Sequence, residues 1–213
     1  MLTLHGYWRS SAAYRVRIAL NLKGLDYAQV THDLRHGEQS AAAYTALNPQ
    51  GLVPALEADG VVLTQSPAIL EWLEETHPDP ALLPADTADR AAVRALMAVI
   101  ACDIHPLNNL RVLRSLKNDL GADQSQIDAW VARWIAPGFD ALEQLITAHG
   151  KGFAFGDRPS LADCCLVPQV YNARRFAIDL TPWPHIAAAD AACAQLPAFA
   201  AAHPSRQPDA DPA

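Results

Sequence analysis

Hydrophobic and polar positions follow two different periods along roughly the first eighty residues of this 213-residue chain. The stretches LTLHGY and YAQVTHDL are typical of strands. Between them, apolar residues from Ser11 to Lys23 recur at helical spacing, and Gly24 is suited to end that helix. A strand, a helix and a strand at this length predict a parallel βαβ unit.

The following segment predicts two more strands and another helix. After a short helix near residues 40–47, the stretches LVPAL and GVVLT predict strands that meet at the turn ADG. QSPAILEWLEETHP predicts a helix with Ser66 as its N-cap and Pro67 in its first turn. The proline-rich stretch HPDPALLPADTAD then predicts a linker.

The rest of the chain has helical spacing. It predicts a long helix over residues 88–119, which Pro106 is expected to kink, and a second over residues 123–148. A third helix begins at the capping box of Ser160 and Asp163, and a last one covers roughly residues 184–195. The tail HPSRQPDADPA is expected to be frayed.

These elements predict an α/β domain over residues 1–82 and an all-helical domain over residues 88–213. The net charge of −7, without a basic run, argues against nucleic acid as a partner. The four cysteines have no C-x-x-C spacing, and the eight histidines no ligand spacing, so we expect reduced cytoplasmic thiols and no metal. Neither a signal peptide nor a membrane-spanning run is expected.

Two adjacent serines, Ser10 and Ser11, stand where the first strand ends and the first helix begins. The unpaired N–H groups of a helix N-terminus favour anions, and a hydroxyl placed there can donate to one. The same hydroxyl can instead cap the helix. Thiol-redox proteins of thioredoxin-like form have C-x-x-C here. This chain has SSAA, which excludes dithiol exchange but not the binding of another molecule's thiolate.

Two further junctions suit an anionic ligand. Pro54 opens a strand, and a cis bond before it would turn the backbone of Val53 toward a ligand; an ordinary edge-strand proline is the alternative. Gln65 and Ser66 start another helix, whose N-terminus suits a carboxylate. Three such junctions in one small domain predict a peptide-like anion as the ligand.

Six segments together resemble the zeta class of glutathione transferases: YWRSSAAYRVRIALNLKG, ALNPQGLVPAL, QSPAILEWLEE, DIHPLNNLRVL, LADCCLVPQVYNARRF and DLTPWP. The resemblance runs from about residue 3 to residue 209 and therefore covers nearly the whole chain. It implies a thioredoxin-like N-terminal domain, a helical C-terminal domain, glutathione as coenzyme and a homodimer.

The resemblance also implies roles for individual residues. Ser10 would activate the glutathione thiolate, with Ser11 in support. Ala12 replaces the cysteine of the family, so no step can require a thiol there. The implied glutathione contacts are Ser10, Ser11, Gln39, the backbone of Val53 before a cis Pro54, Gln65 and Ser66 for the γ-glutamyl carboxylate, His105 and Asn109.

Three arginines are candidates for binding the substrate: Arg9, Arg111 and Arg175. A guanidinium matches a carboxylate through two parallel donors, and a cation stabilises the negative charge that develops on a dicarbonyl. The alternative for each is a surface ion pair or a solvated face. His105 suits a structural hydrogen bond better than catalysis.

The activity implied is the glutathione-dependent cis–trans isomerisation of maleylacetoacetate to fumarylacetoacetate, in tyrosine and phenylalanine breakdown, by reversible thiolate addition to the double bond. A small dicarboxylate is the expected partner, and a membrane is not. Three alternatives stay open: isomerisation of maleylpyruvate in aromatic-acid breakdown, a broader glutathione transferase acting on small α-halo acids, and a glutathione-binding module without turnover.

Overall fold

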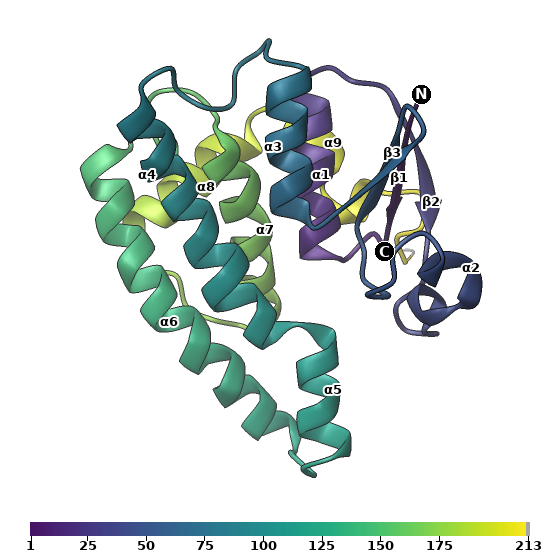
Figure 1. The fold of residues 1–213 in the computed structure, drawn as a ribbon. Coiled ribbons are helices and arrows are strands. Elements are labelled where there is room, and N and C mark those ends of the chain that lie inside the picture. Colours follow the sequence, from purple (N-terminus) through teal and green to yellow (C-terminus); the bar gives the residue numbers. More distant parts are fainter. Residues whose placement is uncertain (212–213) are drawn as a thin grey trace. The chain divides into compact units, whose positions relative to one another are not determined.

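The computed structural model describes residues 1–211, and its helices and strands form two compact units (Figure 1). The first unit contains Met1–Leu82 and the chain from Ala194 onward, and the second contains Leu83–Cys193. The sequence places the C-terminal residues in the helical domain of residues 88–213. They group with the first unit instead, because α9 (Pro197–Ala202) packs against α1 (Ser11–Leu22).

The first unit is built on a four-stranded sheet of order β2-β1-β3-β4. The central strand β1 pairs in parallel with β2 and antiparallel with β3, which pairs antiparallel with β4. The predicted βαβ unit and the two later strands are therefore confirmed. The strands are β1 Leu2–Gly6, β2 Tyr27–Thr31, β3 Ala55–Ala58 and β4 Val61–Thr64.

Helices α1 and α3 (Ser66–Thr76) lie side by side against the sheet (Figure 1). Gly24 follows α1 with a φ of +64°, the left-handed conformation that suits glycine after a helix. The short second helix is present as η1 (Glu38–Ser40) and α2 (Ala42–Thr45). The expected N-cap of α3 is wrong by one residue: Gln65 occupies the cap position and Ser66 is the first helical residue.

The second unit is helical, as predicted, but the long helix of residues 88–119 is interrupted. A π-helical turn and a 3-10 turn occupy residues 99–108, since Pro106 lacks the N–H that would continue the helix. Ile104, at the end of the π-helical turn, packs where a Cβ on Gly138 of α6 would stand. The bounds are α4 Thr87–Ala98, η2 Val99–Ile104, η3 His105–Asn108, α5 Leu110–Asn118, α6 Gln124–His149, α7 Leu161–Arg175 and α8 Pro184–Ala194.

Caps fix the starts of the longer helices in this unit. Asp123 and Ser160 each form a capping box, and the box of Ser160 with Asp163 is the one predicted from the sequence. By length and composition alone, Thr87–Asn118 is the one helical stretch of the described residues that could cross a membrane. This is weak grounds for a membrane span, because core helices of soluble proteins meet the same criterion.

The prediction of a frayed C-terminal tail is wrong for residues 203–211. A 3-10 turn, η4 (Pro204–Arg206), follows α9, and the side chain of Gln207 is buried. Gln207 donates from Nε2 to the carbonyls of Ala201 and His203, each at 2.9 Å. Polar tertiary contacts therefore hold this segment in place, although its sequence has no periodic pattern of apolar residues. The last two residues of the predicted tail lie outside the described residues.

Candidate functional site

Strand register brings the predicted site segments of the first unit to one edge of the sheet. It pairs His5 of β1 with Ala55 of β3, and Ala55 with Thr64 of β4. On the other side, Gly6 pairs with Thr31 of β2. The segments that leave or enter the sheet at this edge are residues 7–11, 32–39, 53–54 and 65–66. Two of them lead into the N-termini of α1 and α3.

Ser10 is the N-cap of α1, and its Oγ accepts a hydrogen bond from the N–H of Ala13 at 3.2 Å. Its own N–H donates to the carbonyl of Tyr7 at 3.0 Å, which closes a tight turn. A hydroxyl that accepts from the backbone keeps its hydrogen to donate. Capping and anion binding by Ser10 are therefore compatible. Ser11 is the first helical residue and is buried.

Arg9 lies between the turn and the serines and is partly exposed. Its guanidinium stands over the ring of Trp8, with Cζ 5.3 Å from the ring centroid. This stacking keeps the cation at the same sheet edge as Ser10. Its role toward a substrate stays a prediction.

The peptide bond between Val53 and Pro54 is cis, as expected. The carbonyl of the preceding Leu52 accepts hydrogen bonds from the Tyr44 hydroxyl at 2.7 Å and from Nδ2 of Asn48 at 2.6 Å. Burial raises the pKa of Tyr44 to about 12, so this hydroxyl stays a donor at neutral pH. Neither the N–H nor the carbonyl of Val53 has a partner among the described residues. The loop is therefore fixed while the Val53 backbone keeps its hydrogen-bonding capacity.

Gln39 lies beside this loop because of Gly51. Gly51 has a φ of +59°, and a Cβ built on it would stand 3.1 Å from the carbonyl oxygen of Gln39. Only glycine combines this conformation with such a close approach. The Oε1 atom of Gln39 is buried, and no described residue donates to it. A buried acceptor of this kind suits a donor supplied by a ligand.

Ser66 is buried at the start of α3, and its hydroxyl is held by a residue of α1. Nη1 of Arg15, itself only 1% exposed, donates to Oγ of Ser66 at 3.1 Å. Gln65 precedes it with a φ of +68° and donates from Nε2 to Oε1 of Gln50. The Ser66 hydroxyl, having accepted from Arg15, can donate toward an anion at the helix N-terminus.

A chain of hydrogen bonds runs behind the sheet edge through Glu57, His5 and His32. Nε2 of His5 lies 2.6 Å from the Glu57 carboxylate, and Nδ1 of His5 lies 3.0 Å from Nε2 of His32. Burial lowers the pKa of His32, and the neighbouring His5 lowers it further, while Glu38 opposes them. A neutral His5 that donates to Glu57 must accept at Nδ1, so His32 then carries its hydrogen on Nε2.

The remaining predicted residues belong to the second unit. His105 lies in η3, and Asn109 caps α5 by accepting from the N–H of Arg111 at 3.1 Å. Arg175 ends α7, with its guanidinium 5.7 Å from the ring centroid of Phe176. The roles of Arg111 and Arg175 toward a ligand, like that of His105, stay predictions.

Arg111 lines an open hollow of about 350 Å³ on α5 together with Val112, Ser115, Leu116 and Leu120. Leu120 is 75% exposed. Apolar side chains next to one guanidinium suit a small organic acid.

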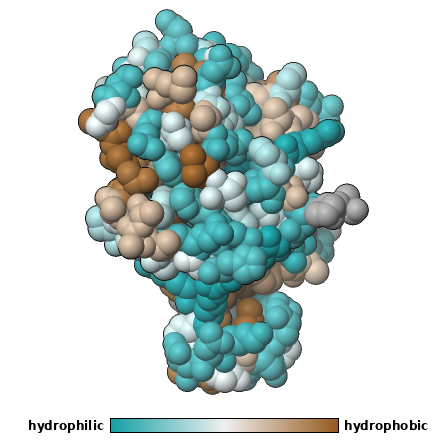
Figure 2. Space-filling model, turned by 90° about the vertical axis from the view of Figure 1, so that its right-hand side faces the viewer, coloured by the Kyte–Doolittle hydropathy of each residue, from teal (hydrophilic) through white to brown (hydrophobic). Residues whose placement is uncertain are grey.

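On the face that Figure 2 shows, hydrophobic residues gather in small groups separated by hydrophilic ones.

Several polar residues that support the site were not predicted from the sequence: His5, Arg15, Arg17, His32 and Asp209. The first unit buries both Arg15 and Arg17, each 1% exposed. A signal for them was present, because two arginines stand two positions apart in the otherwise apolar stretch AAYRVRIAL. Buried arginines require polar partners, and those partners lie in distant parts of the chain.

Comparison with known proteins agrees with this geometry. Residues 9–76 match the model of the glutathione S-transferase N-terminal domain, and residues 124–204 match that of the C-terminal domain. The chain belongs to the glutathione S-transferase family. A solved structure described as a holo maleylpyruvate isomerase of the zeta class has a TM-score of 0.96 and 54% identity to this chain, covering 98% of this chain and 100% of its own.

Two curated relatives cover nearly the full length of this zeta-class chain. A maleylpyruvate isomerase from a Ralstonia species is 54% identical, covering 98% of this chain and 99% of its own. A maleylacetoacetate isomerase from Pseudomonas aeruginosa is 50% identical, covering 98% of both chains. A maleylacetoacetate isomerase structure from Anaeromyxobacter dehalogenans, with glutathione in its active site, has a TM-score of 0.90 and 50% identity, covering 99% of this chain and 98% of its own.

Proposed function

We propose that this chain is a glutathione-dependent cis–trans isomerase that converts maleylacetoacetate to fumarylacetoacetate in the breakdown of tyrosine and phenylalanine. The observation that carries the proposal is the meeting, at one sheet edge, of the N-termini of α1 and α3 with the unpaired backbone of Val53. The near full-length likeness to named isomerases supports it.

The residues at this edge fit glutathione. The Val53 backbone offers one donor and one acceptor to a peptide, and the buried Oε1 of Gln39 offers an acceptor. Gln65 and the hydroxyl of Ser66 suit the γ-glutamyl carboxylate at the N-terminus of α3. When bound, glutathione supplies a thiolate that adds reversibly to the cis double bond, so that the bond can rotate before the thiolate leaves.

Ser10 has the geometry to stabilise that thiolate. Lowering a thiol pKa from about 8.5 by two units requires about 2.7 kcal/mol of preferential stabilisation. A charge-assisted hydrogen bond contributes about 1.5–3 kcal/mol, and a helix N-terminus about 0.3–1 kcal/mol. One hydroxyl at the end of α1 is therefore sufficient, and no general base is required. Ser11 supports this helix end from its buried position.

Arg9 is proposed to hold the carboxylate of the substrate or the negative charge that develops on its dicarbonyl part. Its cation lies one residue before Ser10. Arg111 and Arg175 are proposed for the other end of the dicarboxylate, with His105 and Asn109 toward glutathione. A solved maleylacetoacetate isomerase carries dicarboxyethyl glutathione and citrate in its active site, which supports a carboxylate-rich ligand.

An isomerase assay on maleylacetoacetate, with and without added glutathione, tests the proposal. We expect turnover that requires glutathione and leaves its concentration unchanged. Turnover that is independent of glutathione would contradict the mechanism. Glutathione binding without turnover on any maleyl substrate would instead favour the binding-module alternative, and consumption of glutathione on α-halo acids the broader transferase.

Maleylpyruvate isomerisation is the second candidate, because the Ralstonia relative of that name is 54% identical. The two substrates share the maleyl carboxylate end and differ in the other arm, so the same residues would serve both. The ratio of kcat/KM on the two substrates decides between them.

We further propose that the chain works as a cytoplasmic homodimer. Its free cysteines, three of them buried, suit a reducing compartment. The homodimer follows from the family resemblance. Light scattering on the purified chain tests it, with twice the 23.0 kDa of one chain as the expected mass.

A further inference from the structure

Arg17 is a buried cation whose hydrogen bonds converge on the backbone before Ser10. Nη2 donates to the carbonyl of Trp8 at 2.9 Å, and Nη1 donates to that of Tyr7 at 3.4 Å. Nε donates to the carbonyl of Ala202 in α9 at 3.1 Å. A guanidinium that is 1% exposed requires such partners, and here they fix the backbone of the turn.

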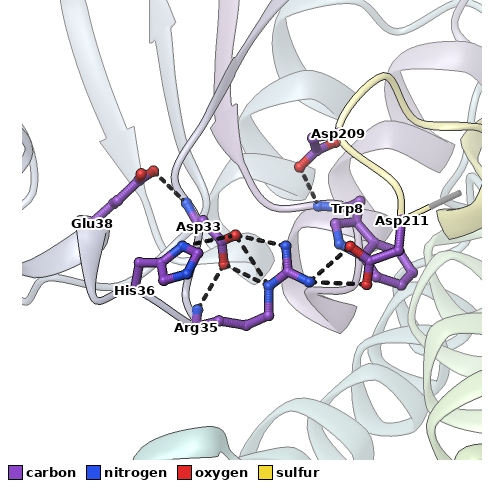
Figure 3. A network of polar contacts seen from close by, with 7 residues as sticks. All are labelled: Trp8, Asp33, Arg35, His36, Glu38, Asp209 and Asp211. Atoms are coloured by element: carbon purple, nitrogen blue, oxygen red, sulfur yellow. Dashed lines mark hydrogen bonds and ion pairs between the residues drawn. The ribbon is translucent and has the colours of Figure 1, made fainter.

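The same turn is held from a second direction by the C-terminal segment. A carboxylate oxygen of Asp209 accepts the N–H of Trp8 at 2.9 Å, as Figure 3 shows. The residue Trp8 is thus bound at its N–H by an anion and at its carbonyl by a cation. Charge-assisted bonds on both sides leave this part of the backbone little freedom to move.

The position of Asp209 is itself well fixed. Gln207, two residues earlier, is 7% exposed and accepts at Oε1 from Nε2 of Gln29 in β2 at 3.0 Å. Two residues later, both carboxylate oxygens of Asp211 accept from Nη1 of Arg35, at 2.7 and 2.9 Å (Figure 3). Asp209 is therefore held between two anchors of the first unit.

We propose that Asp209 is a positioning residue for the thiolate site, acting with Arg17 through the backbone of Trp8 to place Ser10. Ser10 lies two residues beyond Trp8, and its N–H donates to the Tyr7 carbonyl that Arg17 also contacts. A hydrogen bond to a thiolate depends on placement to within about 0.5 Å, which a free turn does not provide. This inference rests on the proposed function of Ser10.

Asp209 is the residue to substitute, because it lies near the surface whereas Arg17 is needed in the core. Asp209→Ala removes the acceptor of the Trp8 N–H. Asp209→Asn keeps an acceptor of nearly the same shape and serves as the rescue. Asp211→Ala is the comparison variant: it removes the same side chain two positions along, where the hydrogen-bond partner is Arg35 and not the backbone of the turn, although Arg35 itself lies over the ring of Tyr7.

Two measurements read the effect: the pKa of the bound glutathione thiol, followed by thiolate absorbance, and steady-state kinetics. Loss of one charge-assisted bond is expected to lower kcat at neutral pH about 10-fold in Asp209→Ala and to raise the bound thiol pKa. KM for glutathione should change less than kcat. Asp209→Asn should recover most of both values. Asp211→Ala removes one anchor of Asp209 but not its bond to Trp8, so it should change both values clearly less than Asp209→Ala does.

The outcomes separate this inference from the proposed function. A normal thiol pKa and kcat in Asp209→Ala, with glutathione binding intact in the unsubstituted chain, would overturn the positioning role alone. Equal losses in Asp209→Ala and Asp211→Ala would overturn it too. In that case the C-terminal segment would stabilise the fold without a specific role for the bond between Asp209 and Trp8. An unsubstituted chain that binds no glutathione in calorimetry would overturn the proposed function together with this inference.

Discussion

Arg15 of α1 donates to the hydroxyl of Ser66 at the start of α3, with 3.1 Å between Nη1 and Oγ. Both side chains are buried, so the bond is shielded from water. Because the Ser66 oxygen accepts from Arg15 on its buried side, the Ser66 hydroxyl hydrogen remains available to donate to a ligand. Two residues that are 51 positions apart in sequence thereby join α1 to α3 at one half of the anion site.

We expect Arg15→Leu to weaken glutathione binding by about 10-fold, because a charge-assisted bond that orients Ser66 is lost. Calorimetric Kd values measure this. Ser66→Ala should weaken binding to a similar extent. If Arg15 acts through Ser66, then adding Arg15→Leu to Ser66→Ala should cost little more. Independent, additive losses would contradict the coupling.

A second prediction separates capping from thiolate activation at Ser10. Ser10→Ala loses both the cap and the hydroxyl donor, whereas glycine is tolerated at an N-cap at a cost of only a few tenths of a kcal/mol. We expect Ser10→Ala to be about 1 kcal/mol less stable and Ser10→Gly to be nearly unchanged in urea unfolding.

Both Ser10 variants should raise the bound thiol pKa toward about 8.5, since both lack the hydroxyl. Ser11→Ala is the matched control at the neighbouring position and should retain most of the shift. If Ser11→Ala abolished the shift and Ser10→Gly did not, the assignment of the two serines would be reversed.

Much of the first unit could be predicted because its signals are local. Gly24 after α1, the turn between β3 and β4, and Pro54 before a strand each depend on short-range chemistry that the sequence displays. The order and direction of the strands then determine which of the connecting segments lie at the same edge of the sheet. For this reason, the segments carrying Ser10, Val53 and Ser66 converge as the resemblance implies.

The contacts of the supporting residues were not predictable, since their partners are distant in sequence. Nothing near Asp209 indicates that its carboxylate binds the N–H of Trp8, 201 residues away. The tail was expected to fray because proline and aspartate give it no apolar period. Similarly, helical spacing continues through residues 99–108, and only packing against α6 and the missing N–H of Pro106 explain the interruption there.

The buried position of His32 predicts a loss of stability in mild acid. The folded pKa of His32 lies below the ordinary 6.5, mainly through burial, so the folded chain disfavours the proton more than the unfolded chain does. This contribution to stability is present above pH 6.5 and is lost as the pH falls through the folded pKa.

We expect the melting temperature to fall less steeply between about pH 6.5 and 5 in His32→Gln than in the unsubstituted chain. Thermal unfolding at several pH values measures this. His36→Gln, which removes an exposed histidine from the same loop, is the control and should keep the original slope. An unchanged slope in His32→Gln would show that titration of His32 does not contribute to stability in this range.

The last prediction concerns Lys23, a buried cation at the end of α1. Its Nζ donates to Glu74 at 2.8 Å, to the carbonyl of His77 at 2.6 Å and to that of Pro80 at 3.0 Å, which ties α3 and the start of the linker to α1. Lys23→Met should destabilise the chain by about 3–5 kcal/mol in urea unfolding, because the Glu74 carboxylate stays buried without its cation.

Adding Glu74→Leu to Lys23→Met removes the stranded charge and should recover part of that loss. Lys117→Met is the matched control, because Lys117 is exposed, and it should change stability by less than about 0.5 kcal/mol. If the double variant were no more stable than Lys23→Met, the loss would come from the carbonyls of the linker. That would identify these carbonyls, and not the carboxylate, as the partners that require Lys23.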